Sequence, residues 1–489
     1  MAGPPFKRLK MIEKPDFYID GAWVAPLEGR AHEVIAPATE EPCTRISLGG
    51  QADTDAAVAA AKAALPGWMA TPVADRIALL EKVLEVYKTR AEDLAQSMSL
   101  EMGAPLDLAR QSQVGAGIAH LGAYIDAAKA FPWEAPLGDH APNDRIIHEA
   151  VGVCALITPW NWPMNQVTLK VGAAMVAGNT MVLKPSEESP LNAMIFAEIM
   201  HDAGVPKGVF NLVNGDGAGV GSQLSEHPDV DMVSFTGSTR AGKLISKAAA
   251  ETLKRVHLEL GGKGANLIFA DADDAAVERG VRSMMNNTGQ SCNAPSRMLV
   301  EASAYDAAVE KAASVANGIE VGPPDKEGKH IGPVVNATQW EKIQGLIQAG
   351  IDEGARLVAG GTGRPEGFNK GFYVRPTVFA DVTNDMTIAQ EEIFGPVMTI
   401  LKFEGEDEAV RIANDTPYGL TNYVQSGDDK RRQRLARQLR AGMIEMNGES
   451  RGKGSPFGGM KMSGNGREAG YWGIHDFVEV KAVSGWGED

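Results

Sequence analysis

Val151-Gly152-Val153-Cys154-Ala155-Leu156-Ile157 is a short, nearly continuous apolar run, and three similar runs follow it in the chain. These are Thr180-Met181-Val182-Leu183, residues 209–213 and Met232-Val233-Ser234-Phe235. Stretches with helical spacing, such as 191–203, lie between them. Buried strands that alternate with helices predict a parallel sheet covered on both faces.

A second set of such elements begins at Asn266-Leu267-Ile268-Phe269. It includes a predicted helix over 340–353 and a predicted strand over 397–403. Because 489 residues are too many for one hydrophobic core, two domains are expected. The sequence therefore predicts an α/β protein with two doubly wound parallel-sheet domains, the first of them a Rossmann-like domain for a cofactor.

The segments before and after these sets predict smaller pieces. Phe17-Tyr18-Ile19-Asp20-Gly21-Ala22-Trp23 is typical of a strand pair that turns at Asp20-Gly21. Helical spacing is found over 53–65, over 73–102 (ending at Gly103) and over 116–131. The polar residues 132–149 and the alternating residues 477–483 indicate a small β excursion, whose edge strands are expected to pair with another subunit.

The composition excludes several classes of protein. The formal net charge of −16 argues against broad nucleic-acid binding, which needs a basic surface. No stretch approaches the roughly 20 apolar residues that cross a bilayer, so no membrane partner is expected. Residues 1–8 are basic but lack a following apolar segment, which predicts a short disordered arm rather than a secretory signal.

The three cysteines are Cys43, Cys154 and Cys292. Their number and scatter predict neither a disulfide framework nor a cysteine-rich metal site, and no metal is expected. Free thiols suit a reducing, cytoplasmic setting. Cys154 lies in an apolar run, where a buried and unreactive thiol is expected.

Cys292 has a different setting. Gly289-Gln290-Ser291-Cys292 places it in a glycine-bearing loop, thirty-three residues after Glu259 in Leu258-Glu259-Leu260-Gly261-Gly262-Lys263. An activated thiol attacks a carbonyl carbon, and a carboxylate can then activate the water that releases the acyl group. Together with a dinucleotide site, this pair points to oxidation of an aldehyde to an acid.

Two motifs indicate that dinucleotide site. Phe235-Thr236-Gly237-Ser238 follows a strand and opens a helix, whose N-terminal N–H groups suit a phosphate; the alternative is an ordinary tight turn. Lys184-Pro185-Ser186-Glu187 follows another strand, where Lys184 and Glu187 suit ribose hydroxyls. Glu187 would repel a 2′-phosphate, which favours NAD over NADP. The alternative is a solvated helix start with Ser186 as its cap.

Seven motifs in order resemble the aldehyde dehydrogenase superfamily over nearly the whole chain. They are Pro159-Trp160-Asn161-Trp162-Pro163, Lys184-Pro185-Ser186-Glu187, Phe235-Thr236-Gly237-Ser238, Leu258-Glu259-Leu260-Gly261-Gly262-Lys263, Gly289-Gln290-Ser291-Cys292, Glu391-Glu392-Ile393-Phe394-Gly395-Pro396 and Pro456-Phe457-Gly458-Gly459. The resemblance implies a homodimer or homotetramer. It also implies an NAD-binding domain over 1–126 and 149–260, a catalytic domain over 261–462, and an oligomerisation segment over 127–148 and 463–489.

The resemblance also implies roles for single residues. Cys292 is expected to be the nucleophile, Asn161 with the Cys292 N–H the oxyanion hole, and Glu259 the base for the hydrolytic water. Glu468 resembles a residue that assists proton relay behind that base. The expected NAD ligands are Ile157, Thr158, Pro159, Trp160, Lys184, Ser186, Glu187, Phe235, Gly237, Ser238, Leu260, Gly261, Glu392 and Phe394. Without the resemblance, Phe394 would be taken for a core aromatic and Glu468 for a surface charge.

The substrate side is expected to consist of Trp162, Gln166, Leu169, Asn293, Arg451 and Phe457. An arginine at a tunnel mouth can pair bidentately with a carboxylate, so Arg451 suggests an ω-oxo acid as the aldehyde. The alternative is that Arg451 is a solvated loop residue. Two rival functions stay open: a CoA-acylating semialdehyde dehydrogenase, which would not need Glu259 as a base, and a non-catalytic protein with this fold.

Overall fold

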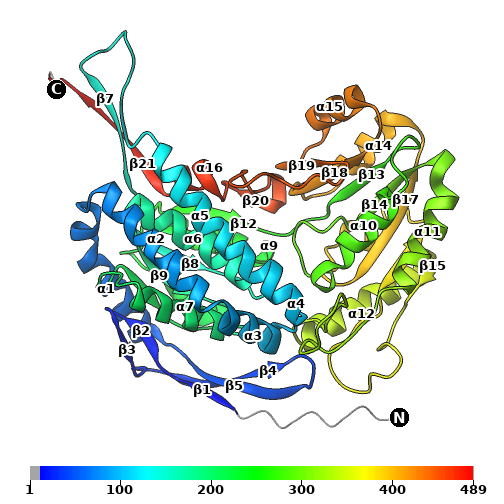
Figure 1. Cartoon of the computed structure of the whole chain (residues 1–489), viewed down its shortest axis with the longest axis horizontal. Helices are drawn as coiled ribbons and strands as arrows, with labels where there is room; N and C mark the ends of the chain where they lie inside the picture. The colour runs from blue at the N-terminus through cyan, green and yellow to red at the C-terminus, as the bar shows by residue number, and fades with distance from the viewer. Residues whose placement is uncertain (1–10, 488–489) are drawn as a thin grey trace.

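The chain forms two α/β lobes that lie side by side, as Figure 1 shows. This structure is a computed structural model, and it describes residues 11–487. The expected N-terminal arm over 1–8 lies outside the described residues. Within them, no helix combines the length and the apolar character that crossing a membrane requires.

The first lobe contains an eight-stranded sheet in the order β20-β12-β11-β8-β9-β10-β2-β3. Its parallel strands are β8 (Val153–Ile157), β9 (Thr180–Lys184), β10 (Phe210–Leu212), β11 (Met232–Thr236) and β12 (Arg255–Glu259). The first four strands match the four apolar runs predicted from the sequence. One edge carries the antiparallel hairpin of β2 (Phe17–Ile19) and β3 (Ala22–Val24). That hairpin turns at the predicted Asp20-Gly21, where both residues have a positive φ, 50° and 80°.

Helices cover both faces of this sheet. Alternate side chains of β8 explain why: Cys154 and Leu156 pack into one apolar cluster, whereas Val153, Ala155 and Ile157 pack into another. The first cluster includes α2 (Val73–Thr89), α3 (Ala91–Met102), α5 (Val114–Ala130), α6 (Pro163–Ala177) and α7 (Leu191–Asp202). The second includes α1 (Gln51–Met69), α8 (Ser222–Glu226) and α9 (Thr239–Ala250).

The single helix predicted over 73–102 is two helices. Arg90 breaks it with a non-helical backbone (φ −102°, ψ 12°), and its guanidinium pairs with Asp93 and Glu198. The predicted end is confirmed, because Gly103 adopts the left-handed conformation at φ 81°. The short helix α4 (Leu106–Leu108) and a π-helical turn (Ala109–Gln113) then lead into α5.

The second lobe contains a seven-stranded sheet in the order β15-β16-β17-β14-β13-β18-β19. Its strands are β13 (Ala265–Ile268), β14 (Arg297–Glu301), β15 (Arg356–Ala359), β16 (Thr377–Ala380), β17 (Val397–Phe403), β18 (Thr421–Gln425) and β19 (Met443–Met446). Only β15 pairs antiparallel. This is the second doubly wound domain that the sequence predicts.

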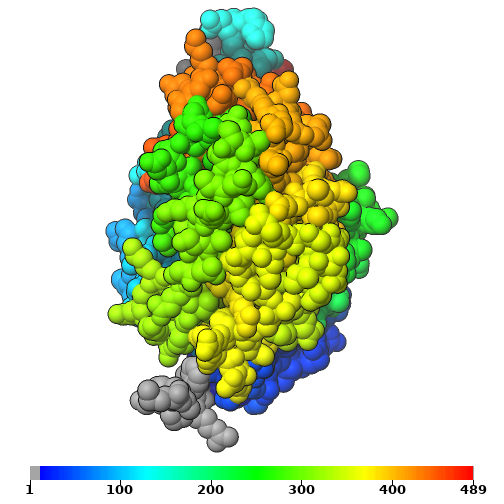
Figure 2. Space-filling model, turned by 90° about the vertical axis from the view of Figure 1, so that its right-hand side faces the viewer, coloured from blue at the N-terminus to red at the C-terminus, as the bar shows by residue number. Residues whose placement is uncertain are grey.

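Helices cover both faces of the second sheet too. One face carries α10 (Ala276–Met285) and α11 (Tyr305–Asn317). The other carries α12 (Ala337–Asp352), α13 (Thr387–Gln390), α14 (Gly405–Asn414) and α15 (Asp429–Gln438). Figure 2 looks onto this lobe, where the green and yellow segments cover most of the visible face.

Two three-stranded sheets lie outside the lobes. One has the order β21-β7-β6, from β6 (Glu134–Pro136), β7 (Asp144–Ala150) and β21 (Val478–Ser484), and it projects from the first lobe in Figure 1. The other, β1 (Ile12–Lys14), β5 (Glu41–Leu48) and β4 (Arg30–Ala36), was not predicted. It links the lobes, because Glu40 beyond β4 pairs with Arg364 of the second lobe.

The segment predicted for oligomerisation, over 463–489, contains elements with different places in the fold. Residues Gly464–Asn465 form β20, which extends the first sheet by pairing antiparallel with β12. The next helix, α16 (Gly470–Asp476), packs against α5 and α6. Only β21 joins the projecting sheet, so this part of the chain returns to the first lobe before it leaves again.

Candidate active site

The carboxyl ends of four neighbouring strands form one side of the candidate site. Strands β12, β11, β8 and β9 are adjacent and parallel, so their carboxyl ends meet at one edge of the first sheet. The predicted residues that lie at or just beyond these ends are Ile157, Thr158, Pro159, Trp160, Asn161, Lys184, Ser186, Glu187, Phe235, Gly237, Ser238, Glu259, Leu260 and Gly261. Four separate motifs of the sequence are thus brought to one edge.

Cys292 lies in a loop of the second lobe that faces this edge. The loop follows α10 and a short turn in which Asn287, Thr288 and Gly289 all have a positive φ, between 49° and 70°. This rare backbone turns the chain sharply before the cysteine. Gly262 lies against the Cys292 carbonyl oxygen, and a side chain there would collide with it. The glycines after Glu259 therefore allow the two lobes to meet at the cysteine.

Asn161 is buried and fixed beside this loop. Its side-chain amide donates to the Gln290 carbonyl oxygen at 3.0 Å. Its own carbonyl accepts from the amides of Asn287 at 2.9 Å and Gln113 at 3.1 Å. Gln113 and Asn287 were not predicted as site residues. Together they fix the Asn161 amide next to the loop of Cys292, which is the position that the predicted oxyanion hole requires.

Glu259 ends β12 in an unusual environment for a carboxylate. The side chain is 2% exposed, and neither oxygen has a hydrogen-bond partner among the described residues. Gly458 leaves room for it, since a Cβ there would lie 2.5 Å from Glu259 Oε1. Burial and the neighbouring Glu468 raise the pKa of Glu259 well above its usual range. A carboxyl with a raised pKa is a stronger base than an ordinary glutamate once it is ionised.

Glu468 lies behind Glu259 and is paired. Its Oε1 is 2.7 Å from Lys170 Nζ, and both side chains are almost fully buried. Lys170 on α6 also donates to Ser234 Oγ at 3.0 Å. A lone lysine in the apolar stretch 167–177 was the signal for this pair, because a lysine is almost never fully buried unless it is paired.

Three carboxyl groups act on the Cys292 thiol. Burial raises its pKa, and the carboxylates of Glu392, Glu259 and Glu468 raise it further. The resting thiol is therefore protonated at neutral pH. Attack requires that it lose its proton to a base when the substrate and cofactor are in place.

The strand ends at β9 and β11 suit a nucleotide. The Lys184 ammonium donates to the carbonyls of Pro185 and Gly215, at 2.7 and 2.6 Å, and lies 3.5 Å from Glu187 Oε2. Ser238 caps α9 by accepting from the Ala241 N–H at 3.3 Å. The N–H groups of the first turn point out of the end of α9, toward the space beyond β11.

Glu392 and Phe394 reach this edge from the second lobe. They lie between α13 and β17, and Phe394 has φ 61°. Glu392 Oε1 accepts from the Gly262 N–H at 2.8 Å. The Phe394 ring meets the Trp160 ring edge to face, with centroids 5.5 Å apart. The structure thus brings all fourteen predicted cofactor residues to one region between the lobes.

A cavity of about 320 Å³ opens beside Cys292. All six predicted substrate residues line it, together with Cys292 itself. Its other lining residues are Ala116, Ala119, His120, Asn165, Gly452, Lys453, Gly454, Ser455 and Ala469. The wall is therefore largely apolar near Trp162, Leu169 and Phe457, with polar groups at a few points, as in many small-molecule sites.

The cations at this cavity already have protein partners. Arg451 Nε lies 2.9 Å from Glu445 Oε1, and the guanidinium stacks 4.9 Å from the centre of the Phe457 ring. Lys453 Nζ lies 2.6 Å from Asp126 Oδ2. Neither carboxylate was predicted as a partner: Asp126 lies on α5, far away in the sequence, and Glu445 lies on β19, six residues before Arg451. Arg451 is therefore neither a free cation nor simply a solvated loop residue.

His120 adds a neutral polar group to the wall. Its Nε2 lies 2.7 Å from Asn165 Oδ1, and burial lowers its pKa to about 4. At neutral pH the ring is uncharged, so one ring nitrogen donates and the other accepts. It was not predicted as a site residue.

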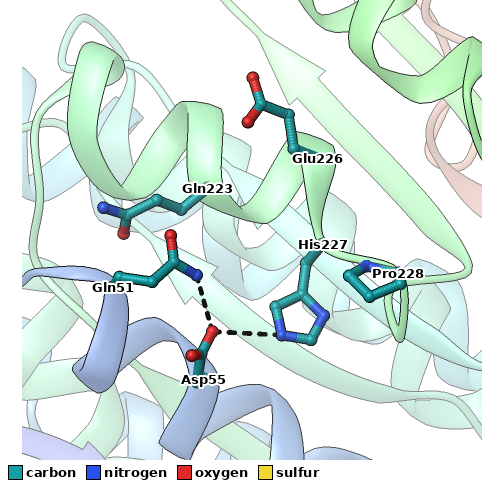
Figure 3. A pocket seen from close by; sticks show the side chains of 6 residues that line it. All are labelled: Gln51, Asp55, Gln223, Glu226, His227 and Pro228. Atoms are coloured by element: carbon teal, nitrogen blue, oxygen red, sulfur yellow. Dashed lines mark hydrogen bonds and ion pairs between the residues drawn. The ribbon is translucent and has the colours of Figure 1, made fainter.

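A second cavity of about 330 Å³ lies between α1 and α8, lined by Gln51, Asp55, Gln223, Glu226, His227 and Pro228. Figure 3 shows interactions among three of its polar residues: Asp55 accepts from Gln51 at 2.7 Å and lies 3.4 Å from His227 Nε2. It shares no residue with the cavity at Cys292. Among the residues the structure describes, no group of three or more His, Cys, Asp or Glu is placed to hold a metal ion.

Comparison with known proteins decides the family. Residues 23–483 match the model of the aldehyde dehydrogenase family. The chain belongs to this family. The predicted resemblance is thereby confirmed, and the enzyme is an NAD-dependent aldehyde dehydrogenase, an oxidoreductase that acts on aldehydes.

Individual relatives agree with this assignment over the full length. A "3-succinoylsemialdehyde-pyridine dehydrogenase" of a Pseudomonas species is 50% identical over 97% of this chain and 99% of its own. A crystal structure of an aldehyde dehydrogenase from Bartonella henselae is 56% identical, with a TM-score of 0.96 over 97% of this chain and 100% of that one. Aldehyde dehydrogenase C of Pseudomonas syringae, solved as a cysteine-to-alanine mutant with NAD+ and octanal, is 47% identical, with a TM-score of 0.95 over 97% of both chains.

Proposed function

We propose that the enzyme oxidises an aldehyde to a carboxylic acid with NAD+ and water, through a thioester on Cys292. One observation carries the proposal: Cys292 lines a cavity of about 320 Å³ on one side and meets the strand ends of the first sheet on the other. A substrate carbonyl and a cofactor can therefore reach the same sulfur from opposite sides.

The residues of the chain divide the chemistry between them. The Cys292 thiol gives its proton to water in the cavity as its sulfur attacks the aldehyde carbon, and the Asn161 amide with the Cys292 N–H holds the oxygen that becomes negative. Bound NAD+, held at the strand ends and by Glu392 and Phe394, would supply the acceptor for the hydride of this carbon. Glu259 then takes a proton from water, whose oxygen bonds to the thioester carbon, and the C–S bond breaks to release the acid. The sulfur leaves as a thiolate and takes a proton back from water in the cavity, so the proton from the hydrolytic water stays on Glu259.

The cofactor side fits NAD in its residue types. The free N–H groups at the start of α9 suit a pyrophosphate, with Gly237 and Ser238 at the turn. Glu187 is 29% exposed in its side chain and suits a ribose 2′-hydroxyl, while it repels a 2′-phosphate. Glu392 and Phe394 close the other end. Two solved relatives, from Pseudomonas syringae and Bacillus cereus, are complexes with NAD+.

For the substrate, we propose a semialdehyde whose far end carries a neutral hydrogen-bond acceptor. Arg451 and Lys453 are paired with Glu445 and Asp126, so a carboxylate would find no unpaired cation at the cavity. An uncharged ketone or ring nitrogen can accept from Arg451 without displacing Glu445. The name of the 50% identical relative, which cites a pyridine semialdehyde, supports this choice over an ω-oxo acid.

The test compares three aldehydes: octanal, 8-oxooctanoic acid and a γ-keto aldehyde with a pyridine ring. NADH formation is followed in NAD+ without CoA, and kcat/KM is compared. The keto aldehyde should be preferred. Preference for the oxo acid would overturn the substrate proposal, and turnover that requires CoA would favour the CoA-acylating rival and overturn the hydrolytic mechanism.

We also propose a cytoplasmic homodimer or homotetramer. Three free cysteines support a reducing compartment. β21 is the outer strand of the projecting sheet, and Val480 on it is 58% exposed. An exposed edge of this kind is suited to pairing with another subunit. Light scattering on the purified enzyme should give a mass near twice or four times that of one chain.

A further inference from the structure

The reaction leaves a proton on a buried group. Each turnover ends with Glu259 protonated, and Glu259 is 2% exposed. Glu468 and Lys170 behind it are 1% and 0% exposed in their side chains. Since their polar partners are Ser234 and each other, this predicted branch does not reach solvent through the residues the structure describes. The proton needs another way out.

His257 lies on the other side of Glu259. His257 lies two residues before Glu259 on β12. Because successive side chains of a strand point to opposite faces, these two lie on the same face. His257 Nε2 is 3.7 Å from Glu259 Oε1, and His257 Nδ1 is 3.6 Å from Asp476 Oδ2. The imidazole is 2% exposed, and neither ring nitrogen has a hydrogen-bond partner among the described residues. An unpaired buried imidazole between two carboxylates calls for an explanation.

Glu259, His257 and Asp476 form a row of contacts, and Asp476 is its outer end. Its side chain is 31% exposed, whereas His257 and Glu259 are almost fully buried. The Arg467 N–H fixes it by donating to Oδ2 at 2.5 Å. Gly466, at φ 83°, leaves the necessary space: a Cβ there would lie 2.6 Å from Asp476 Oδ2 and 2.8 Å from His257 Cδ2. The backbone is therefore shaped around the contact between Asp476 and His257.

We propose that His257 and Asp476 carry the proton of Glu259 to solvent. This inference rests on the proposed role of Glu259 as the base. After the acid leaves, the Glu259 carboxyl gives its proton to Nε2 of the neutral ring, and the ring gives its Nδ1 proton to Asp476, which releases it to water. At 3.6–3.7 Å, a small side-chain movement or one bridging water closes each gap. Rotation of the ring, or exchange with an entering water, then resets the tautomer.

The surroundings of the His257 ring favour its neutral form, so a proton that it accepts is readily passed on. Burial lowers the pKa of His257 well below its usual range, and Lys170 and Arg467 lower it further. The carboxylates that face the region are Glu259, Glu468 and Asp476. The resting ring is therefore neutral, with one nitrogen able to accept and one able to donate.

The test is pre-steady-state NADH formation by His257→Gln, with Asp476→Asn as a second variant. Glutamine keeps a polar side chain of similar length but cannot accept a proton at one atom and release another. We expect a full first-turnover burst of NADH, then a steady-state rate lower by about tenfold to a hundredfold. Added imidazole should restore part of that rate. His475→Gln, next to Asp476 but outside the row, is the matched control and should behave as the unmodified enzyme.

Glu259→Gln separates the proposed role of Glu259 as the base from the proposed proton path through His257 and Asp476. If Glu259→Gln keeps the burst and loses steady turnover while His257→Gln and Asp476→Asn turn over normally, the proton path is wrong and the base stands. If Glu259→Gln turns over normally, both are wrong. Equal loss of burst and steady rate in the His257 variant, without rescue by imidazole, would mean that His257 only supports the packing, and it would also overturn the path.

Discussion

The two sides of the Cys292 sulfur are built differently. The cofactor side consists of neighbouring parallel strand ends, at β12, β11, β8 and β9, with two residues added from the second lobe. The substrate side consists of α5, α6, the cysteine loop and residues 451–457, which are far apart in the sequence. Strand ends are fixed by the sheet, whereas loops vary freely. The cofactor site is therefore tied to the sheet, whereas the aldehyde site depends on how two helices and two loops pack together.

Removal of the shared sulfur should have the largest effect, because both sides act through it. Cys292→Ala should lower kcat at least about a thousandfold with every aldehyde. The measurement is NADH formation, with Cys43→Ala as a control, since Cys43 is buried and does not line the cavity. Residual activity above a tenth of normal would mean that the thioester route is wrong.

Removal of the oxyanion donor comes next. Asn161→Ala should lower kcat by about a hundredfold to a thousandfold, because its amide acts only once charge develops on the oxygen. KM for octanal should change little. A variant that raises KM but keeps kcat would assign Asn161 to binding, on the substrate side of the comparison.

The charge on the sulfur itself can be measured in the free enzyme. The pKa of Cys292 is raised, so the thiolate is the minor form at neutral pH. As long as the pH stays below that pKa, each rise of one pH unit increases the thiolate fraction about tenfold. Alkylation of Cys292 by iodoacetamide should therefore accelerate by about a hundredfold between pH 7 and pH 9, without a plateau. A plateau near pH 7 would contradict the three-carboxylate environment. Cys292→Ala gives the background rate.

The same contrast explains what the sequence could predict. Lys184 and Glu259 end a parallel strand and Ser238 follows one, so their meeting at one edge follows from a parallel sheet. Asp126 could not be predicted as the partner of Lys453, because nothing local records which loop lies over which helix. Glu445 is only six residues from Arg451, but their pairing depends on how the chain turns back after β19. His257 was within reach, since alternation places it on the face of Glu259.

The fold shows the same division. Strands β8, β9, β10, β11, β13 and β17 were predicted from apolar runs, but β20 was not, because Gly464-Asn465 carries no such run. Its place is fixed by pairing with β12, where the Leu258 N–H donates to Asn465 Oδ1 at 3.0 Å. The separation of α2 from α3 at Arg90 could not be predicted from the sequence either, since Arg90 pairs with Glu198 of another helix.

A smaller effect is expected at the outer end of the cofactor side. Glu187→Ala should lower the preference for NAD over NADP by about tenfold, because the repulsion of a 2′-phosphate is removed. The ratio of kcat/KM values for the two cofactors measures it. Glu188→Gln, one residue further on, is the control. An unchanged ratio would place the ribose away from Glu187.

The smallest effect is expected for Glu445→Gln, which is also the most specific test of the substrate side. It removes the counter-charge of Arg451 and keeps the shape of the side chain, so the guanidinium at Phe457 becomes an unpaired cation. The kcat/KM for 8-oxooctanoic acid should then rise several-fold to about tenfold, while octanal changes little. Asp126→Asn, which frees the more exposed Lys453, should give a weaker effect, because its charge is better screened. If neither variant favours the oxo acid, Arg451 does not face the far end of the substrate, and the selectivity must come from Gln166, His120 and the apolar wall instead.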